Sequence, residues 1–136
     1  MIRRRGVCEP PICECTGRLI DPGVNVVDLG VNIARTTSIL AMREEPNGKV
    51  IAFEPHPVLF KELQYNIAAW TQNSQAASIV AHKLALRSTP GVAQLTVPAE
   101  FAMNHGVSYL PCDAQANSKV NRFEAAVTTL DGVVAG

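Results

Sequence analysis

Short apolar runs alternate along the first two thirds of the chain with longer segments that have helical periodicity. Residues 24–29 (VNVVDL) and 49–53 (KVIAF) are rich in β-branched side chains, and residues 79–81 form a third run of the same kind. Such runs are typical of strands that are buried on both faces of a parallel sheet. The pattern therefore predicts three parallel strands.

The two segments between these runs have the spacing of amphipathic helices. Residues 33–43 are expected to form a helix with apolar faces. A second helix is expected to begin at Pro57, because proline suits the first turn of a helix, and to end at residues 72–74. Its apolar positions, at spacings of four, four and three, are Leu59, Leu63, Ile67 and Trp70. Strand, helix, strand, helix, strand is half of a doubly wound sheet, so the pattern predicts an α/β fold.

The pattern changes after Pro90 and Gly91. Residues 92–97 alternate weakly, which suits an antiparallel or added strand, and residues 125–130 suggest a last strand with no helix after it. Residues 84–86 either continue the third strand or open a loop, and residues 101–106 resemble a loop. Residues 1–18 lack periodicity, so we expect a loose N-terminal extension followed by one domain over residues 19–136.

Charge and hydropathy exclude several classes of partner. Twelve basic and twelve acidic residues cancel, which gives no general attraction to nucleic acid or to an anionic membrane. No apolar run reaches the roughly 18–20 residues of a membrane helix, and no signal-peptide pattern is present. We therefore expect a cytoplasmic protein with no nucleic-acid or membrane partner.

The cysteines do not match a familiar metal pattern. Cys8, Cys13 and Cys15 form one C-x4-C-x-C cluster, and Cys112 stands alone. Structural zinc sites favour repeated C-x2–4-C pairs, and this chain has no second pair. Free thiols are favoured over a metal site or disulfides, so no metal is predicted, and the role of the cluster is left open.

The first candidate site is the segment 28–34, where a strand gives way to a helix. Gly30 allows the backbone to approach a ligand closely, and a helix N-terminus attracts a phosphate or carboxylate. An ordinary β–α turn is the alternative. Only one glycine of the G-x-G-x-x-G fingerprint is present, which argues against an NAD-dependent oxidoreductase.

The second candidate is Glu54, at the end of the second predicted strand. An acidic side chain about 20 residues beyond the glycine turn is placed to accept both hydroxyls of a ribose. A surface glutamate is the alternative, although the position between an apolar strand and Pro55 makes simple solvation less expected. Gly30 and Glu54 together predict a nucleoside ligand.

Several motifs occur in the order found in a known family. They are VVDLGVNIARTT, VIAFEPHPVLFKELQYNI, HKLALRSTPGVAQL, NHGVSYL and VTTLD. In this order they resemble the FkbM-type methyltransferases over about residues 22–131. The most specific part is Phe53-Glu54-Pro55 followed by a helix with Leu63 and Asn66. The resemblance implies a class I Rossmann-like methyltransferase sheet, S-adenosylmethionine as cofactor, and O-methylation of a small-molecule or sugar hydroxyl.

The resemblance also implies a cofactor site. Asp28 and Gly30 would lie against the methionine part, and Asn32 would hydrogen-bond near its carboxylate. Glu54 would hold the ribose diol with His56 beside it.

The resemblance extends the site beyond the third strand. The stretch 82–85, which includes Ala85, would lie near the adenine. Asn104 and Gly106 match a loop that faces the open side of the pocket.

The chain departs from the family pattern in two places. Ala34 stands where the family loop usually has a second glycine, and the strand with a K-x-D-x-E-G motif that should follow Asp131 is absent. We therefore expect a sheet that is incomplete at its C-terminal end, and a partial S-adenosylmethionine-binding domain. An open sheet edge favours pairing with a second copy, so a homodimer is expected, and a non-catalytic module that self-associates is the alternative function.

The acceptor chemistry is less defined. A hydroxyl acceptor can need a base, and the candidates are His56, His105 and Asp131. A structural or exposed role is favoured for each, so no catalytic residue is predicted. The expected partner is a small-molecule acceptor of unspecified identity.

Overall fold

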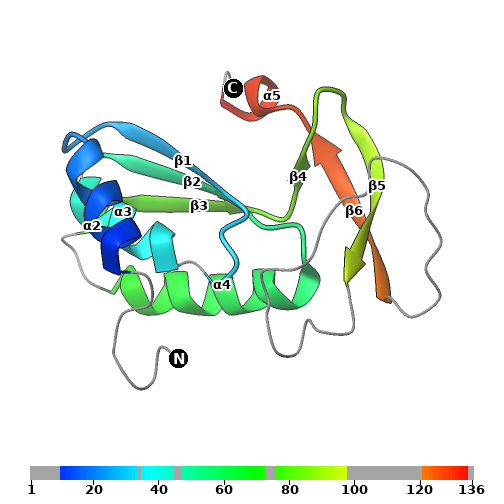
Figure 1. Cartoon of the computed structure of the whole chain (residues 1–136), viewed down its shortest axis with the longest axis horizontal. Coiled ribbons are helices and arrows are strands. Elements are labelled where there is room, and N and C mark those ends of the chain that lie inside the picture. The colour runs from blue at the N-terminus through cyan, green and yellow to red at the C-terminus, as the bar shows by residue number, and fades with distance from the viewer. Residues whose placement is uncertain (1–9, 34, 45–46, 73–75, 98–120, 135–136) are drawn as a thin grey trace.

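The computed structural model describes residues 10–33, 35–44, 47–72, 76–97 and 121–134. Two three-stranded sheets lie side by side, with helices below the first of them (Figure 1). The first sheet has the strand order β1-β2-β3 and the second has the order β4-β6-β5.

The first sheet is parallel and follows the predicted βαβαβ order. Its strands are β1 (Asn25–Leu29), β2 (Lys49–Phe53) and β3 (Ser78–His82), and Val27 pairs with Ile51, which pairs with Val80. The crossovers are α3 (Arg35–Glu44) and α4 (Pro57–Trp70). The bounds of β2 are those that the sequence pattern predicts, and α4 begins at Pro57 as predicted.

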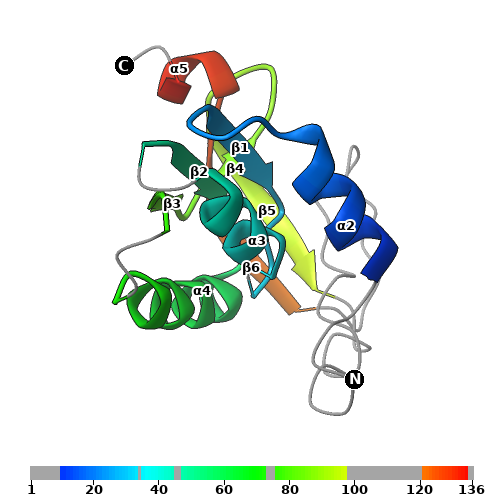
Figure 2. The same cartoon turned by 90° about the vertical axis from the view of Figure 1, so that its left-hand side faces the viewer.

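Both crossover helices pack on the same face of this sheet (Figure 2). Alternate residues of β2 point to that face: Val50 packs in one cluster with Leu40 of α3, and Ala52 packs in another with Leu63 of α4. Trp70 borders the second cluster, which is the core role favoured by its spacing. Val31, the neighbour of Gly30, belongs to the same cluster as Ala52 and Leu63, so this cluster lies behind the strand ends that carry Gly30 and Glu54.

The second sheet holds the later part of the chain. It consists of β4 (Ala85–Leu86), β5 (Gly91–Val97) and β6 (Asn121–Thr128), with β6 parallel to β4 and antiparallel to β5. The expectation of an antiparallel strand at residues 92–97 is confirmed. Residues 84–86 neither continue β3 nor form only a loop, because Ala85 and Leu86 pair with β6 in the second sheet.

Two helices lie where the sequence pattern predicts none. The N-terminal segment is not loose throughout, because α2 (Pro10–Leu19) is helical and packs against α3. A short helix α5 (Leu130–Val134) follows β6, where no helix was expected. The boundary between an N-terminal extension and the domain stays a prediction.

Strand β1 is less buried than predicted. Its middle residues are half-buried and Leu29 is 56% exposed, whereas β2 is buried from Val50 to Phe53. The reason is that, among the described residues, β1 pairs with β2 alone. No helix within the described ranges is long and apolar enough to span a membrane.

Candidate functional site

The ends of the three parallel strands are tied together by backbone hydrogen bonds. The N–H groups of Gly30 and Val31 donate to the carbonyl oxygen of Phe53, at 3.0 and 3.3 Å. The N–H of Glu54 donates to the carbonyl of His82 at 3.1 Å. The loop after β1 and the loop after β2 therefore meet at the carboxyl edge of the sheet, the edge at which open α/β folds bind ligands.

Gly30 has a conformational reason to be glycine. Its φ is +66°, in the left-handed region where a Cβ is strained. A Cβ placed there would meet nothing within 4 Å, so the space beside this backbone is open. The residue thus combines a forced turn with room for a ligand to approach.

Glu54 is enclosed although it carries a carboxylate. Only 5% of the surface of this residue is exposed to solvent. Oε2 accepts the N–H of Asn32 at 2.8 Å and Oε1 accepts the N–H of His56 at 2.9 Å. Burial raises the pKa of Glu54 above its usual value, and the two backbone N–H groups offset part of that rise. A surface glutamate, the alternative interpretation of the sequence, does not fit this environment.

Asn32 adopts an uncommon backbone conformation. Its φ is +55°, in a region where asparagine is tolerated better than most residues. This conformation directs the Asn32 N–H to Glu54, so the contact joins the two candidate sites directly.

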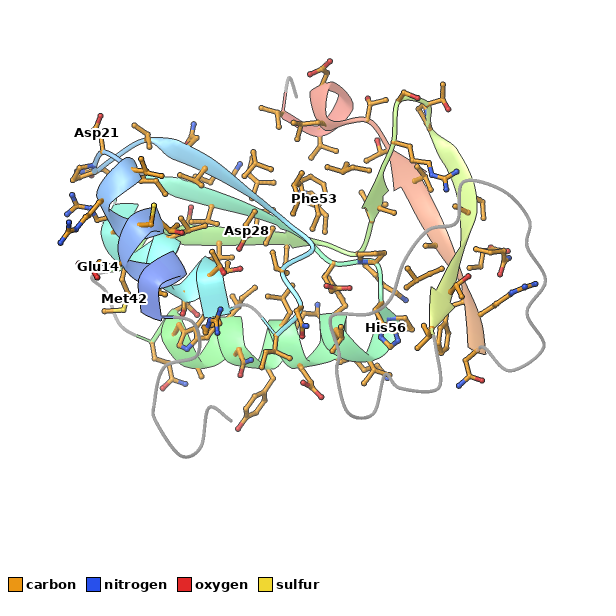
Figure 3. All side chains as sticks on the ribbon, in the orientation of Figure 1. Glu14, Asp21, Asp28, Met42, Phe53 and His56 are labelled. Atoms are coloured by element: carbon orange, nitrogen blue, oxygen red, sulfur yellow. The ribbon has the colours of Figure 1, made fainter. Side chains whose placement is uncertain are left out.

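The carboxylate of Asp28 accepts a hydrogen bond from helix α3. The hydroxyl of Thr37, on α3, donates to Oδ2 of Asp28 at 2.7 Å, and Figure 3 shows Asp28 on the lower side of β1. Burial raises the pKa of Asp28, and the Thr37 hydroxyl counters part of the effect. The carboxylate thereby ties the end of β1 to the helix that follows it.

His56 caps α4. Its residue is 2% exposed, and Nδ1 accepts the N–H groups of Val58 and Leu59 at 3.2 and 3.4 Å. The ring of His56, which Figure 3 labels, also meets Phe123 of β6 edge to face, with centroids 5.2 Å apart. Because Nδ1 accepts these bonds, its lone pair is engaged in capping α4 and is not free to take a proton.

Ala85 is set apart from the other predicted residues. Hydrogen bonds connect Glu54 directly with Asn32 and His56, whereas Ala85 is buried in the core of the second sheet with Leu95 and Val127. The structure does not describe six further residues that the sequence analysis considered, namely Ala34, Asn104, His105, Gly106, Cys8 and Cys112.

Two polar residues near the site received no role from the sequence, although Asn66 belongs to the most specific motif of the resemblance. Thr37 is fully buried and bonds Asp28, and the side chain of Asn66 donates through Nδ2 to the carbonyl of Ile33 at 2.9 Å. Both lie on the apolar stripes of their helices, Thr37 three residues before Leu40 and Asn66 three after Leu63. A polar residue on a buried stripe needs a partner, and that signal could have found them.

No metal cluster of three or more His, Cys, Asp or Glu side chains is present in the part of the chain that the structure describes. Cys15 is exposed with a free thiol. A groove of about 680 Å³ lies on the helix side of the glycine loop, and it is lined by Ile33, Lys61, Glu62, Tyr65 and Asn66.

The residues at the strand ends suit a nucleoside with an attached carboxylate. Each oxygen of Glu54 has one recorded N–H partner and retains acceptor capacity for a hydroxyl. Gly30 leaves open space beside the loop, and the N-terminus of the ten-residue helix α3 follows this loop. S-adenosylmethionine contains both a ribose diol and a carboxylate, so the donor and acceptor set fits it.

Comparisons with known proteins place the fold. No family model matches the sequence, and no curated protein matches it either. The chain is similar to an S-adenosylmethionine-dependent O-methyltransferase structure from Thermotoga maritima, at 11% identity and a TM-score of 0.50, over 93% of this chain and 69% of that one.

Two further structures share less of the chain. A candidate rRNA methylase from Clostridium thermocellum has 16% identity and a TM-score of 0.47, over 54% of this chain and 38% of that one. A TehB-like S-adenosylmethionine-dependent methyltransferase from Corynebacterium glutamicum has 13% identity and a TM-score of 0.43, over 65% and 44%. This chain thus spans less than half the length of these two. The parallel sheet, its helices and the Thermotoga likeness together show a Rossmann-like α/β fold.

Proposed function

We propose that this chain binds S-adenosylmethionine and transfers its methyl group to a hydroxyl oxygen of a small molecule or sugar, as FkbM-type methyltransferases do. The observation that carries the proposal is the position of Glu54. Its carboxylate is buried at the end of β2 and is hydrogen-bonded to the glycine loop that follows β1. A carboxylate fixed in this way can accept hydrogen bonds from both hydroxyls of a ribose, while the glycine lets the backbone come close to the ligand.

Each residue at the strand ends has a distinct task in this proposal. Glu54 accepts the two ribose hydroxyls, and the loop from Gly30 to Asn32 receives the methionine part next to the N-terminus of α3. Asp28 fixes the start of that helix through Thr37. The cofactor supplies the activated methyl group, and the protein supplies alignment, which is worth on the order of 7–11 kcal/mol in well-oriented reactions.

The acceptor hydroxyl must lose a proton during the transfer. Of the predicted candidates, His56 is occupied as a helix cap and Asp131 is exposed in the first turn of α5. We therefore assign no base among the described residues. Alignment of the acceptor with the methyl group is the main contribution that we propose for the protein.

Calorimetric titration with S-adenosylhomocysteine tests the proposal. Wild-type protein should bind, and Glu54→Ala should lose most of the affinity, while Glu124→Ala, which removes an exposed carboxylate on β6, should bind normally. Ligand at 100 times its dissociation constant should also stabilise the wild type by about 2.7 kcal/mol, which a thermal melt detects. Circular dichroism establishes that each variant is folded.

The contrary result is also informative. Folded wild-type protein that binds no S-adenosylhomocysteine would refute the proposal and leave a non-catalytic Rossmann-like module. Binding that survives in Glu54→Ala would place the ligand elsewhere on the molecule.

A further inference from the structure

Four consecutive residues of the loop after β1 are each held through a backbone group. Gly30 and Val31 donate to the Phe53 carbonyl, Asn32 donates to Glu54, and Ile33 accepts from Asn66. The first three contacts reach only the end of β2. The fourth contact comes from Asn66, which lies within helix α4.

We propose that Asn66 is a positioning residue that sets the glycine loop for the methionine end of the cofactor, through its hydrogen bond to the Ile33 carbonyl. This inference rests on the proposed function and extends it to a residue that touches no ligand. Asn66 stands 33 positions after Ile33 in the chain, so the bond fixes the loop to a separate element.

Geometry at the loop explains why one side-chain bond matters there. Gly30 and Asn32 both have positive φ, so the loop is in a conformation that most residues disfavour and that its contacts must maintain. The bond to Ile33 holds the far end of the loop, next to the start of α3. Loss of that bond should loosen the loop at Ile33, beside the start of α3 where the proposal places the methionine part, and leave the bond between Asn32 and Glu54 in place.

The surroundings of Asn66 make this bond accessible to solvent. Asn66 and Ile33 both line the groove on the helix side of the loop, together with the exposed Tyr65. Asn66 itself is half-buried, so its removal leaves no large cavity in the core. Substitution should therefore alter the loop more than the stability of the fold.

The test compares two ligands that share the adenosine part. S-adenosylhomocysteine carries the amino-acid end, and 5′-methylthioadenosine lacks it. Asn66→Asp keeps the side-chain shape but removes the donor, and Asn66→Ala removes the whole amide. Gln64→Ala is the matched control, because it removes an exposed amide from the same helix.

We expect both Asn66 variants to bind S-adenosylhomocysteine roughly three- to tenfold more weakly, the range that corresponds to one hydrogen bond. Their affinity for 5′-methylthioadenosine should match the wild type, and Gln64→Ala should bind both ligands normally. Without ligand, hydrogen exchange at the Ile33 amide should be faster in the Asn66 variants, while the Gly30 and Val31 amides, which stay bonded to Phe53, should exchange at the wild-type rate.

Other results would overturn the inference in distinguishable ways. Equal weakening for both ligands, or none, with wild-type binding intact, would reject the positioning role and leave the proposed function standing. Unchanged amide exchange in the variants would reject it on structural grounds alone. Wild-type protein that binds neither ligand would refute the proposed function, and this inference with it.

Discussion

The backbone N–H of Asn32 and the carboxylate of Glu54 meet at 2.8 Å, across 22 positions of sequence. The same carboxylate accepts the N–H of His56 through its other oxygen. Glu54 therefore holds the loop after β1 and the start of α4 in addition to any ligand. A substitution at Glu54 should affect folding as well as binding, so the two effects need separate measurement.

Stability should depend on pH through Glu54 and Asp28. Burial raises both pKa values in the folded state, so each group holds its proton more tightly there than in the unfolded chain. Their contribution is then fully present below about pH 4, where the unfolded carboxyls titrate, and is lost as pH rises through the higher folded pKa values. Urea unfolding of wild type and Glu54→Gln across pH 4–8 measures this, and the variant should have the flatter profile. Parallel profiles would contradict the assignment.

Thr37 should be sensitive to the loss of its hydroxyl. It is fully buried, and its hydroxyl donates to Oδ2 of Asp28 at 2.7 Å. Thr37→Val keeps the volume but removes the donor, so we expect a loss of roughly 1–3 kcal/mol in the free energy of unfolding. Thr37→Ser keeps the donor and serves as control, with a cost near that of one methyl group. Equal costs for the two variants would show that the bond contributes little.

His56 should act on stability through the cap of α4. His56→Ala removes the acceptor for the Val58 and Leu59 N–H groups and the ring that meets Phe123, so we expect a loss of roughly 2–4 kcal/mol. His56→Asn restores a preferred capping side chain and should recover about 1 kcal/mol of that loss. Chemical denaturation measures both. If His56→Asn is no better than His56→Ala, capping is not the role of this residue.

The homodimer expected from an open sheet edge stays a prediction that sedimentation can test. Leu29 on β1 is 56% exposed, and β1 has β2 as its recorded partner among the described residues. We expect wild-type protein to dimerise with rising concentration, and Leu29→Lys to shift it to monomer because charge on an edge strand opposes pairing. Val58→Lys, at an exposed apolar position on α4, is the control. A wild-type monomer at all concentrations would rule out this interface.

Local periodicity was enough to predict much of the fold. The run KVIAF became β2 with the predicted bounds, and the helix from Pro57 to Trp70 was predicted from its apolar spacing. Helix α2 was missed because Pro10, Pro11 and Gly17 are poor helix formers. Its packing against α3 is a tertiary effect, which a local pattern does not contain.

The sequence predicted where the residues of the candidate site lie on the strands, but not the hydrogen bonds between them. The sequence placed Gly30 and Glu54 at strand ends, and parallel strands bring those ends together. That Asn32 connects them depends on a positive φ, which sequence spacing does not reveal. The role of Ala85 as a cofactor contact stays a prediction; the sequence did not reveal that Ala85 is buried in the core of the second sheet, where the chain pairs again three residues after His82.

Phe53 joins the ends of all three parallel strands by two different means. Its carbonyl accepts from Gly30 and Val31, while its ring stacks on His82 with centroids 5.2 Å apart. A side-chain substitution at Phe53 removes the ring and leaves the carbonyl in place. Alanine scanning therefore does not test the backbone hydrogen bonds of this junction, and side-chain substitutions during evolution do not remove them. Proteins with a different side chain at this position can therefore keep the same loop. Replacing the amide of Gly30 with an ester removes its N–H and thus tests the bond to the Phe53 carbonyl directly.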